Sequence, residues 1–133
     1  MNNRFFIYGK SGSGKTAFAH RYAKDNLITF PLTSWGFSKA YNCVKRRVTN
    51  DSVFLWDLFE HQSKGYTNWI SKVDKLKPNH SHIICSIYPP EHYNKRIQTF
   101  IKDYNFIPIK LNDDSHTPWE TVKQHLDNLI LTL

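Results

Sequence analysis

Five short apolar runs along this chain predict buried strands, and each has a glycine, a proline or a polar residue at or near its C-terminal end. They are residues 4–8, 27–30, 52–58, 82–88 and 106–111. Proline lacks the N–H group that a strand donates to its neighbour. Pro108 in the last run therefore places that strand at the edge of a sheet.

Between these runs, apolar residues recur at the spacing of amphipathic helices. They predict a helix that ends near Asp25, one that Pro78 stops, and one between the fourth and fifth runs. Thr117-Pro118-Trp119-Glu120 has the form of a capping box with proline at the first helical position, and predicts a C-terminal helix over 117–133. The stretch 33–50 gives no clear prediction. The apolar faces are Phe18, Ala19, Tyr22 and Ala23; Trp69, Ile70, Val73 and Leu76; Tyr93, Ile97, Phe100, Ile101 and Tyr104; and Trp119, Val122, Leu126, Leu129, Ile130 and Leu133.

Strand and helix thus alternate through the chain, and such connections are expected to join parallel strands with helices packed on both faces of the sheet. The 133 residues amount to about one domain. We therefore predict a single α/β domain over residues 1–133, built on a mainly parallel five-stranded sheet.

The composition is that of a folded protein. Apolar residues make up 40% of the chain and aromatic residues 15%, which excludes disorder on compositional grounds. No stretch approaches the roughly 20 apolar residues of a membrane span, and the N-terminus does not resemble a signal peptide. We therefore expect a cytoplasmic protein with no membrane partner. Cys43 and Cys85 lack metal-ligand spacing and are expected as reduced thiols.

The chain is also basic, with 18 Lys and Arg against 11 Asp and Glu and a formal net charge of +7. A surface of this kind attracts polyanions, so nucleic acid is a candidate partner. The densest cluster, Lys45-Arg46-Arg47, is interpreted as a solvated loop or helix end.

One motif carries specific chemistry. Gly9-Lys10-Ser11-Gly12-Ser13-Gly14-Lys15-Thr16 matches the pattern GxxxxGK(S/T), directly after a predicted strand and before a predicted helix. Its glycines let backbone N–H groups turn inward to form an anion nest at the positive end of the helix. Lys15 is expected to reach the β- and γ-phosphates of ATP, and the Thr16 hydroxyl to ligate Mg²⁺. The predicted fold is therefore a P-loop NTPase, a three-layer α/β/α sandwich.

The run Val53-Phe54-Leu55-Trp56-Asp57 has the form of a Walker B strand, an apolar strand that ends in an acid. Asp57 is predicted as a catalytic residue that also holds Mg²⁺. Hydrolytic relatives place a second acid immediately after it to orient water, and here that position is Leu58. Glu60 is the nearest substitute, and a solvated loop residue is an equal alternative. ATP binding is thus better supported than ATP hydrolysis.

The run 82–88 contains or adjoins further polar residues with a candidate role: Ser86, and the pair His80 and His82. Ser86 lies near its end, where many P-loop ATPases sense the γ-phosphate; a hydroxyl bonded to its own backbone is the alternative. His80 and His82 have the look of metal ligands, but no third ligand is near in the sequence. We interpret both histidines as part of a surface turn.

These motifs resemble the AAA+ ATPase domain of bacterial replication initiators and their regulators, the DnaA and Hda-like proteins. The resemblance rests on residues 7–20, on an apolar strand followed by Pro89-Pro90, and on a next strand that leads to Asp113-Asp114. It implies an ATP-binding module that regulates the initiation of DNA replication and works through another replication protein or a second copy of itself. The family's arginine-finger segment has no match in residues 98–103, which implies an incomplete hydrolytic apparatus.

Two other classes of P-loop protein remain open, as does a P-loop relic that binds no nucleotide. A superfamily 3 helicase of small viruses suits the interval from Lys15 to Asp57, but its sensor asparagine is replaced by Ile87. A small nucleotide or metabolite kinase needs a lid rich in arginine over the transferred phosphate. Arg96 is the one arginine between Tyr88 and Phe106.

Overall fold

The computed structural model describes residues 3–10, 15–30, 34–57 and 66–111, and a parallel sheet lies at its centre. Five strands pair in the order β2-β3-β4-β1-β5, and every pair is parallel. The strands are β1 (Arg4–Tyr8), β2 (Leu27–Phe30), β3 (Val53–Asp57), β4 (Ser81–Ser86) and β5 (Ile107–Lys110). The predicted α/β class is confirmed, and so is the edge position of the strand that contains Pro108.

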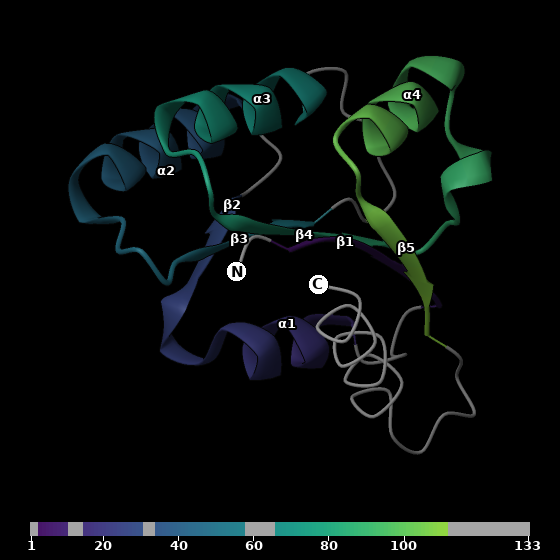
Figure 1. Ribbon diagram of the computed structural model, residues 1–133, viewed down its shortest axis with the longest axis horizontal. Helices are drawn as coiled ribbons and strands as arrows, with labels where there is room; N and C mark the ends of the chain where they lie inside the picture. Colours follow the sequence, from purple (N-terminus) through teal and green to yellow (C-terminus); the bar gives the residue numbers. More distant parts are fainter. Residues whose placement is uncertain (1–2, 11–14, 31–33, 58–65, 112–133) are drawn as a thin grey trace.

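Helices cover both faces of the sheet (Figure 1), which confirms the three-layer arrangement. Helix α1 (Lys15–Ala23) lies on one face, followed by the short η1 (Lys24–Asn26). The other face carries α2 (Ser34–Arg47), α3 (Tyr66–Leu76) and α4 (Lys95–Asp103), the last preceded by η2 (Pro90–His92). The predicted C-terminal helix 117–133 lies outside the described residues.

Helix α2 occupies the stretch that the hydrophobic pattern left unassigned. Of its described side chains, Val44 alone is buried, while Ala40 and Tyr41 are half-buried. Over these described side chains the buried face is narrow, and such a face produces little of the apolar periodicity from which helices are predicted. The interpretation of Lys45-Arg46-Arg47 as a helix end is confirmed, because α2 ends at Arg47.

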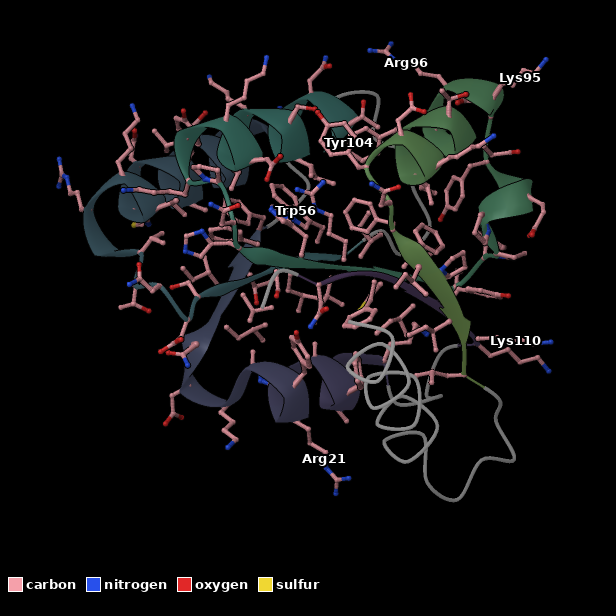
Figure 2. The ribbon with its side chains drawn as sticks, viewed as in Figure 1. Arg21, Trp56, Lys95, Arg96, Tyr104 and Lys110 are labelled. Carbon is pink, nitrogen blue, oxygen red and sulfur yellow. The ribbon has the colours of Figure 1, made fainter. Side chains whose placement is uncertain are left out.

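The two faces of the sheet have separate cores, because neighbouring residues of a strand point to opposite sides. In β1, Phe6 packs beneath α2–α4 with Phe54 and Trp56, whereas Phe5 and Ile7 pack against α1. The rings of Phe30 and Trp56 are stacked 4.2 Å apart. Figure 2 shows Trp56 between sheet and helices, while Arg21, Lys95, Arg96 and Lys110 project outward.

Because Phe54 is fully buried on a central strand and meets Phe30 edge to face at 5.7 Å, we expect the variant Phe54→Ala to lower the free energy of unfolding by about 3–5 kcal/mol. Urea unfolding followed by tryptophan fluorescence measures this. The exposed Lys102→Ala should stay within about 0.5 kcal/mol of wild type. Equal effects of the two substitutions would contradict the assignment of Phe54 to the core.

Candidate functional site

The predicted phosphate loop begins where β1 ends, and its lysine is the first residue of α1. The Lys15 side chain is only 6% exposed, and its ammonium donates to the carbonyl oxygens of Gly9 at 2.8 Å and Lys10 at 2.9 Å. The charge is thereby held at the start of the loop. A buried ammonium beside the positive end of a helix dipole is an arrangement that a bound anion would stabilise.

Strand β4 joins the candidate residues Ser86 and Asp57 to the same edge of the sheet as the loop. It lies between β1 and β3, and its Ser86 carbonyl accepts a hydrogen bond from the Gly9 N–H at 3.1 Å. The thiol of Cys85 donates to the carbonyl of Lys15 at 3.9 Å. Asp57 is the last residue of β3 and stands in register with Cys85. The carboxyl ends of β1, β3 and β4 therefore meet around the start of the loop.

The structure describes only part of the predicted site. The side chains of Thr16 and Asp57 lie outside what is described, although their backbones belong to α1 and β3. Residues Ser11, Gly12, Ser13 and Gly14 of the loop, and Glu60, also lie outside the described residues. For all of these, the assigned roles stay predictions.

Ser86 is described completely, and its side chain is 1% exposed. Its hydroxyl donates to the Tyr88 carbonyl at 2.9 Å and accepts from the Tyr88 N–H at 3.0 Å. It also forms a short hydrogen bond with the hydroxyl of Tyr93. These contacts turn the chain at Ser86, so that β4 ends two residues before the predicted run 82–88 does. The Ser86 hydroxyl is thus bonded to the backbone, which was the alternative to a contact with the γ-phosphate.

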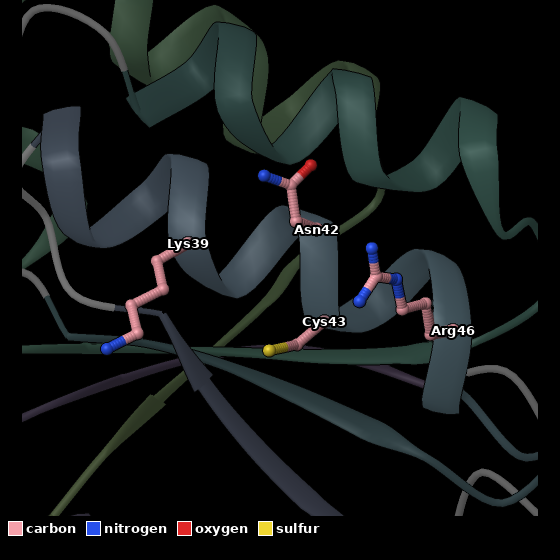
Figure 3. Close-up of a pocket in the computed structure, with 4 residues that line it drawn as sticks. All are labelled: Lys39, Asn42, Cys43 and Arg46. Atoms are coloured by element: carbon pink, nitrogen blue, oxygen red, sulfur yellow. The ribbon is translucent and has the colours of Figure 1, made fainter.

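A basic groove of about 490 Å³ lies along one face of α2 (Figure 3). Its lining residues are Lys39, Asn42, Cys43 and Arg46. They are spaced three and four apart and therefore share one helix face. Elsewhere on α2, the Tyr41 ring faces two cations: the ammonium groups of Lys45 and of Lys72 of α3 each stand 4.9 Å from its centre. The sequence placed positive charge here but gave no sign of a groove.

The interpretation of His80 and His82 as a surface turn is wrong, because both side chains are buried. His82 is the second residue of β4 and is 1% exposed. The two ring nitrogens of His80 face main-chain carbonyls, with Nε2 at 2.9 Å from Thr49. Within the described ranges, no group of three His, Cys, Asp or Glu side chains is arranged to hold a metal ion.

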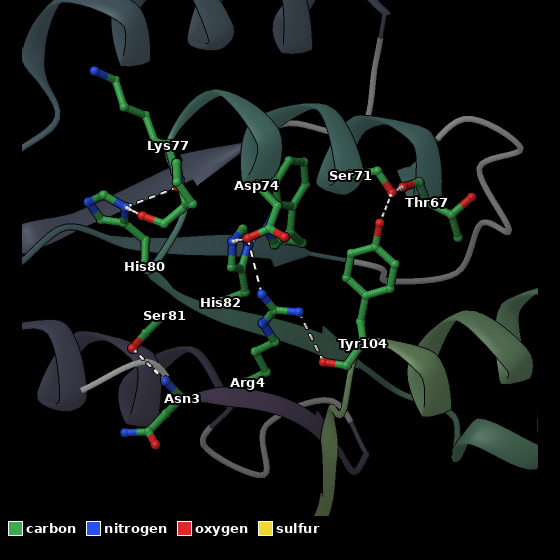
Figure 4. A network of polar contacts seen from close by, with 12 residues as sticks. Asn3, Arg4, Thr67, Ser71, Asp74, Lys77, His80, Ser81, His82 and Tyr104 are labelled. Atoms are coloured by element: carbon green, nitrogen blue, oxygen red, sulfur yellow. Dashed lines mark hydrogen bonds and ion pairs between the residues drawn. The ribbon is translucent and has the colours of Figure 1, made fainter.

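His82 belongs to a polar network beneath α3 (Figure 4). Its Nδ1 accepts from the indole N–H of Trp56 at 3.1 Å, and its Nε2 lies 3.8 Å from Asp74. Asp74 is paired with Arg4 at 3.1 Å. Burial, and then the charge of Arg4, lower the pKa of His82 to about 3. A proton on Nδ1 would face the indole donor, so the ring is kept neutral.

Comparison with known proteins identifies the fold. No protein-family model matches the chain. No curated protein matches its sequence either. The solved structure of AMPPCP-bound DnaA from Aquifex aeolicus is similar over 96% of this chain, with a TM-score of 0.51 and 18% sequence identity. The match covers 46% of that DnaA chain, so this chain spans about half its length.

At this identity the likeness shows the fold alone, which is the parallel α/β fold that this chain shares with the DnaA structure. The predicted fold class is thereby confirmed. In the part of the chain that the structure describes, no helix is both long and apolar enough to cross a membrane.

The buried neutral histidine makes stability depend on pH. The unfolded His82 takes up a proton below its ordinary pKa of about 6.5, whereas the folded form does so only near 3. The contribution of neutral His82 to the free energy of unfolding is therefore complete above about pH 6.5 and is lost as the pH falls toward 3. We expect the free energy of unfolding to decrease by up to about 1.4 kcal/mol per pH unit in that window.

Urea unfolding at several pH values measures this slope, and His82→Asn should flatten it because asparagine does not titrate. The variant His20→Asn, at an exposed position, serves as the matched control and should show the same pH slope as the wild type. A wild-type slope in the His82 variant would contradict the assignment.

Proposed function

We propose that this chain is an ATP-binding P-loop module in which residues 9–16 surround the phosphates. The observation that carries the proposal is the buried Lys15 ammonium, held on the carbonyls of Gly9 and Lys10 at the N-terminus of α1. Such a cation is suited to the β- and γ-phosphates. The AMPPCP bound by the DnaA of similar fold supports a nucleotide as the ligand.

Mg²⁺ fits the same edge of the sheet. Asp57 ends β3 in register with Cys85, and the Cys85 thiol contacts the Lys15 carbonyl at the start of α1, one residue before Thr16. A carboxylate and a hydroxyl supply the oxygen ligands that Mg²⁺ prefers. Bound there, the ion would neutralise phosphate charge, while Lys15 orients the phosphate chain.

Hydrolysis by this module is proposed to be weak or absent. Leu58 follows Asp57 where hydrolytic relatives carry a second acid, which leaves Glu60 as the candidate to orient water. A module that binds ATP and rarely cleaves it is suited to regulation. Together with the DnaA-like fold, this favours a regulator of DNA replication initiation that acts on another replication protein or on a second copy of itself. The regulator is proposed to be a single domain over residues 1–133.

The test is an ATP titration followed by thermal unfolding, with and without Mg²⁺. At about 100 times Kd, ATP should stabilise the wild type by about 2.7 kcal/mol. Lys15→Ala should abolish this stabilisation because it removes the ammonium. Lys75→Ala, at an exposed position of α3, should retain it. A shift that survives in Lys15→Ala would refute the site.

Phosphate release recorded on the same samples separates the alternatives. A regulator should bind ATP with negligible turnover and transfer no phosphate to nucleosides or nucleic-acid ends. Turnover stimulated by DNA would favour the helicase-like alternative, and phosphate transfer to a small molecule would favour the kinase.

Nucleic acid is proposed as a second partner, through the basic face of α2. The 14 residues of α2 contain no acid, and its groove is lined by Lys39 and Arg46 together with Asn42 and Cys43. Lys45 and Lys72, each 4.9 Å from the Tyr41 ring, add two further cations on α2 and α3. Such a surface attracts a phosphate backbone without reading its sequence.

We expect Lys39→Glu with Arg46→Glu to weaken binding of a single-stranded oligonucleotide by at least about tenfold, and to reduce the salt dependence of that binding. The matched control is Lys95→Glu with Lys102→Glu on α4, which changes the net charge equally. Fluorescence anisotropy at several salt concentrations gives both quantities. Equal losses in the two double variants would show that net charge, and not the face of α2, governs binding.

A further inference from the structure

Gly9 joins the end of β4 to the ammonium of the phosphate loop. The Gly9 N–H donates to the Ser86 carbonyl at 3.1 Å, and the Gly9 carbonyl accepts from the Lys15 ammonium at 2.8 Å. The position of Gly9 is therefore set from β4, and the position of the ammonium is set in part from Gly9. A displacement of Ser86 would be transmitted to Lys15 along this path.

The Ser86 hydroxyl has no capacity left for a ligand in this arrangement. A hydroxyl offers one donor and two acceptor sites. Its hydrogen goes to the Tyr88 carbonyl, and its two lone-pair sites face the Tyr88 N–H and the Tyr93 hydroxyl. To donate to a γ-phosphate, this hydroxyl would have to break its bond to Tyr88.

Tyr93 is the donor in its bond with Ser86, because the one hydrogen of Ser86 is already used. The Tyr93 side chain is 4% exposed, and its ring meets Phe6 of β1 edge to face at 6.1 Å. Burial raises the pKa of the Tyr93 phenol, which keeps the hydroxyl protonated at neutral pH. The Tyr93 carbonyl accepts from the Gln98 side chain of α4 at 2.7 Å.

Resting on the nucleotide site proposed above, we propose that Ser86 and Tyr93 are positioning residues, which hold Gly9 and Lys15 in place for the phosphates without touching the nucleotide. This differs from the sequence prediction, in which Ser86 contacts the γ-phosphate. The two roles have different consequences. A lost γ-phosphate contact weakens ATP and spares ADP, whereas a displaced Lys15 weakens both, because both nucleotides carry a β-phosphate.

The deciding experiment measures Kd for ATP and for ADP, each with Mg²⁺, by isothermal titration calorimetry. Tyr93→Phe and Ser86→Ala should each weaken both nucleotides by about three- to tenfold, which is the effect of one hydrogen bond. The ratio of the two Kd values should stay within about twofold of wild type. Should Tyr93→Phe fail to fold, Ser86→Ala carries the same test.

The matched control is Tyr104→Phe. Its hydroxyl also bonds a serine, Ser71 of α3, at 2.7 Å, but this pair lies between α3 and the end of α4 and has no contact with Gly9 among those described. This variant should lose comparable stability and keep both Kd values. The control separates an effect of positioning from a general loss of stability.

Three results would overturn the proposal. Wild-type Kd values in both variants would remove the positioning role. Weakened ATP with unchanged ADP in Ser86→Ala would make Ser86 a γ-phosphate ligand. Binding of neither nucleotide by the wild type would refute the nucleotide site itself, and the positioning role with it. That last outcome is distinguished from the others because it is seen before any substitution is made.

Discussion

The insertion of β4 between β1 and β3 is the constraint on which the rest of this structure depends. All six residues of β4 are buried, so the strand has a well-packed neighbour on each side and a core on each face. Parallel pairing then places the carboxyl ends of three strands at one edge. The Gly9 N–H finds its acceptor there, and the loop between β1 and α1 starts from a fixed point.

Three polar side chains of β4 enter this core, and each is bonded to a group from another part of the chain. Ser81 accepts from the Asn3 N–H, His82 accepts from the Trp56 indole, and Ser86 pairs with Tyr93. Loss of such a bond would leave a buried polar group unsatisfied and cost stability, so these bonds disfavour other positions of the strand. The same strand that forms the centre of the fold thus also sets the geometry of the candidate site.

The buried side chains of His82 and Lys15 have opposite hydrogen-bond surroundings. His82 lies next to a hydrogen-bond donor and the charge of Arg4, and is kept neutral. Lys15 lies next to two carbonyl oxygens, which stabilise an ammonium. The difference lies at one nitrogen: Nδ1 of buried His82 faces a donor, whereas the Lys15 ammonium faces acceptors. It is consistent with a structural role for His82 and with the ligand-binding role proposed for Lys15.

The amino-acid sequence by itself determined the parallel α/β class, the edge strand that contains Pro108 and the position of the candidate phosphate-loop motif between β1 and α1. These features depend on residues close together in the chain, such as an apolar run, a proline or a motif of eight residues. Only the tertiary structure decided that His82 is a core residue and that the Ser86 hydroxyl is saturated. Their partners, Trp56 and Tyr93, come from other segments, and burial and hydrogen-bond capacity exist only once those segments have met. Helix α2 was not predicted for the same reason, since the buried face of its described side chains is narrow and is recognised only against the sheet that the helix covers.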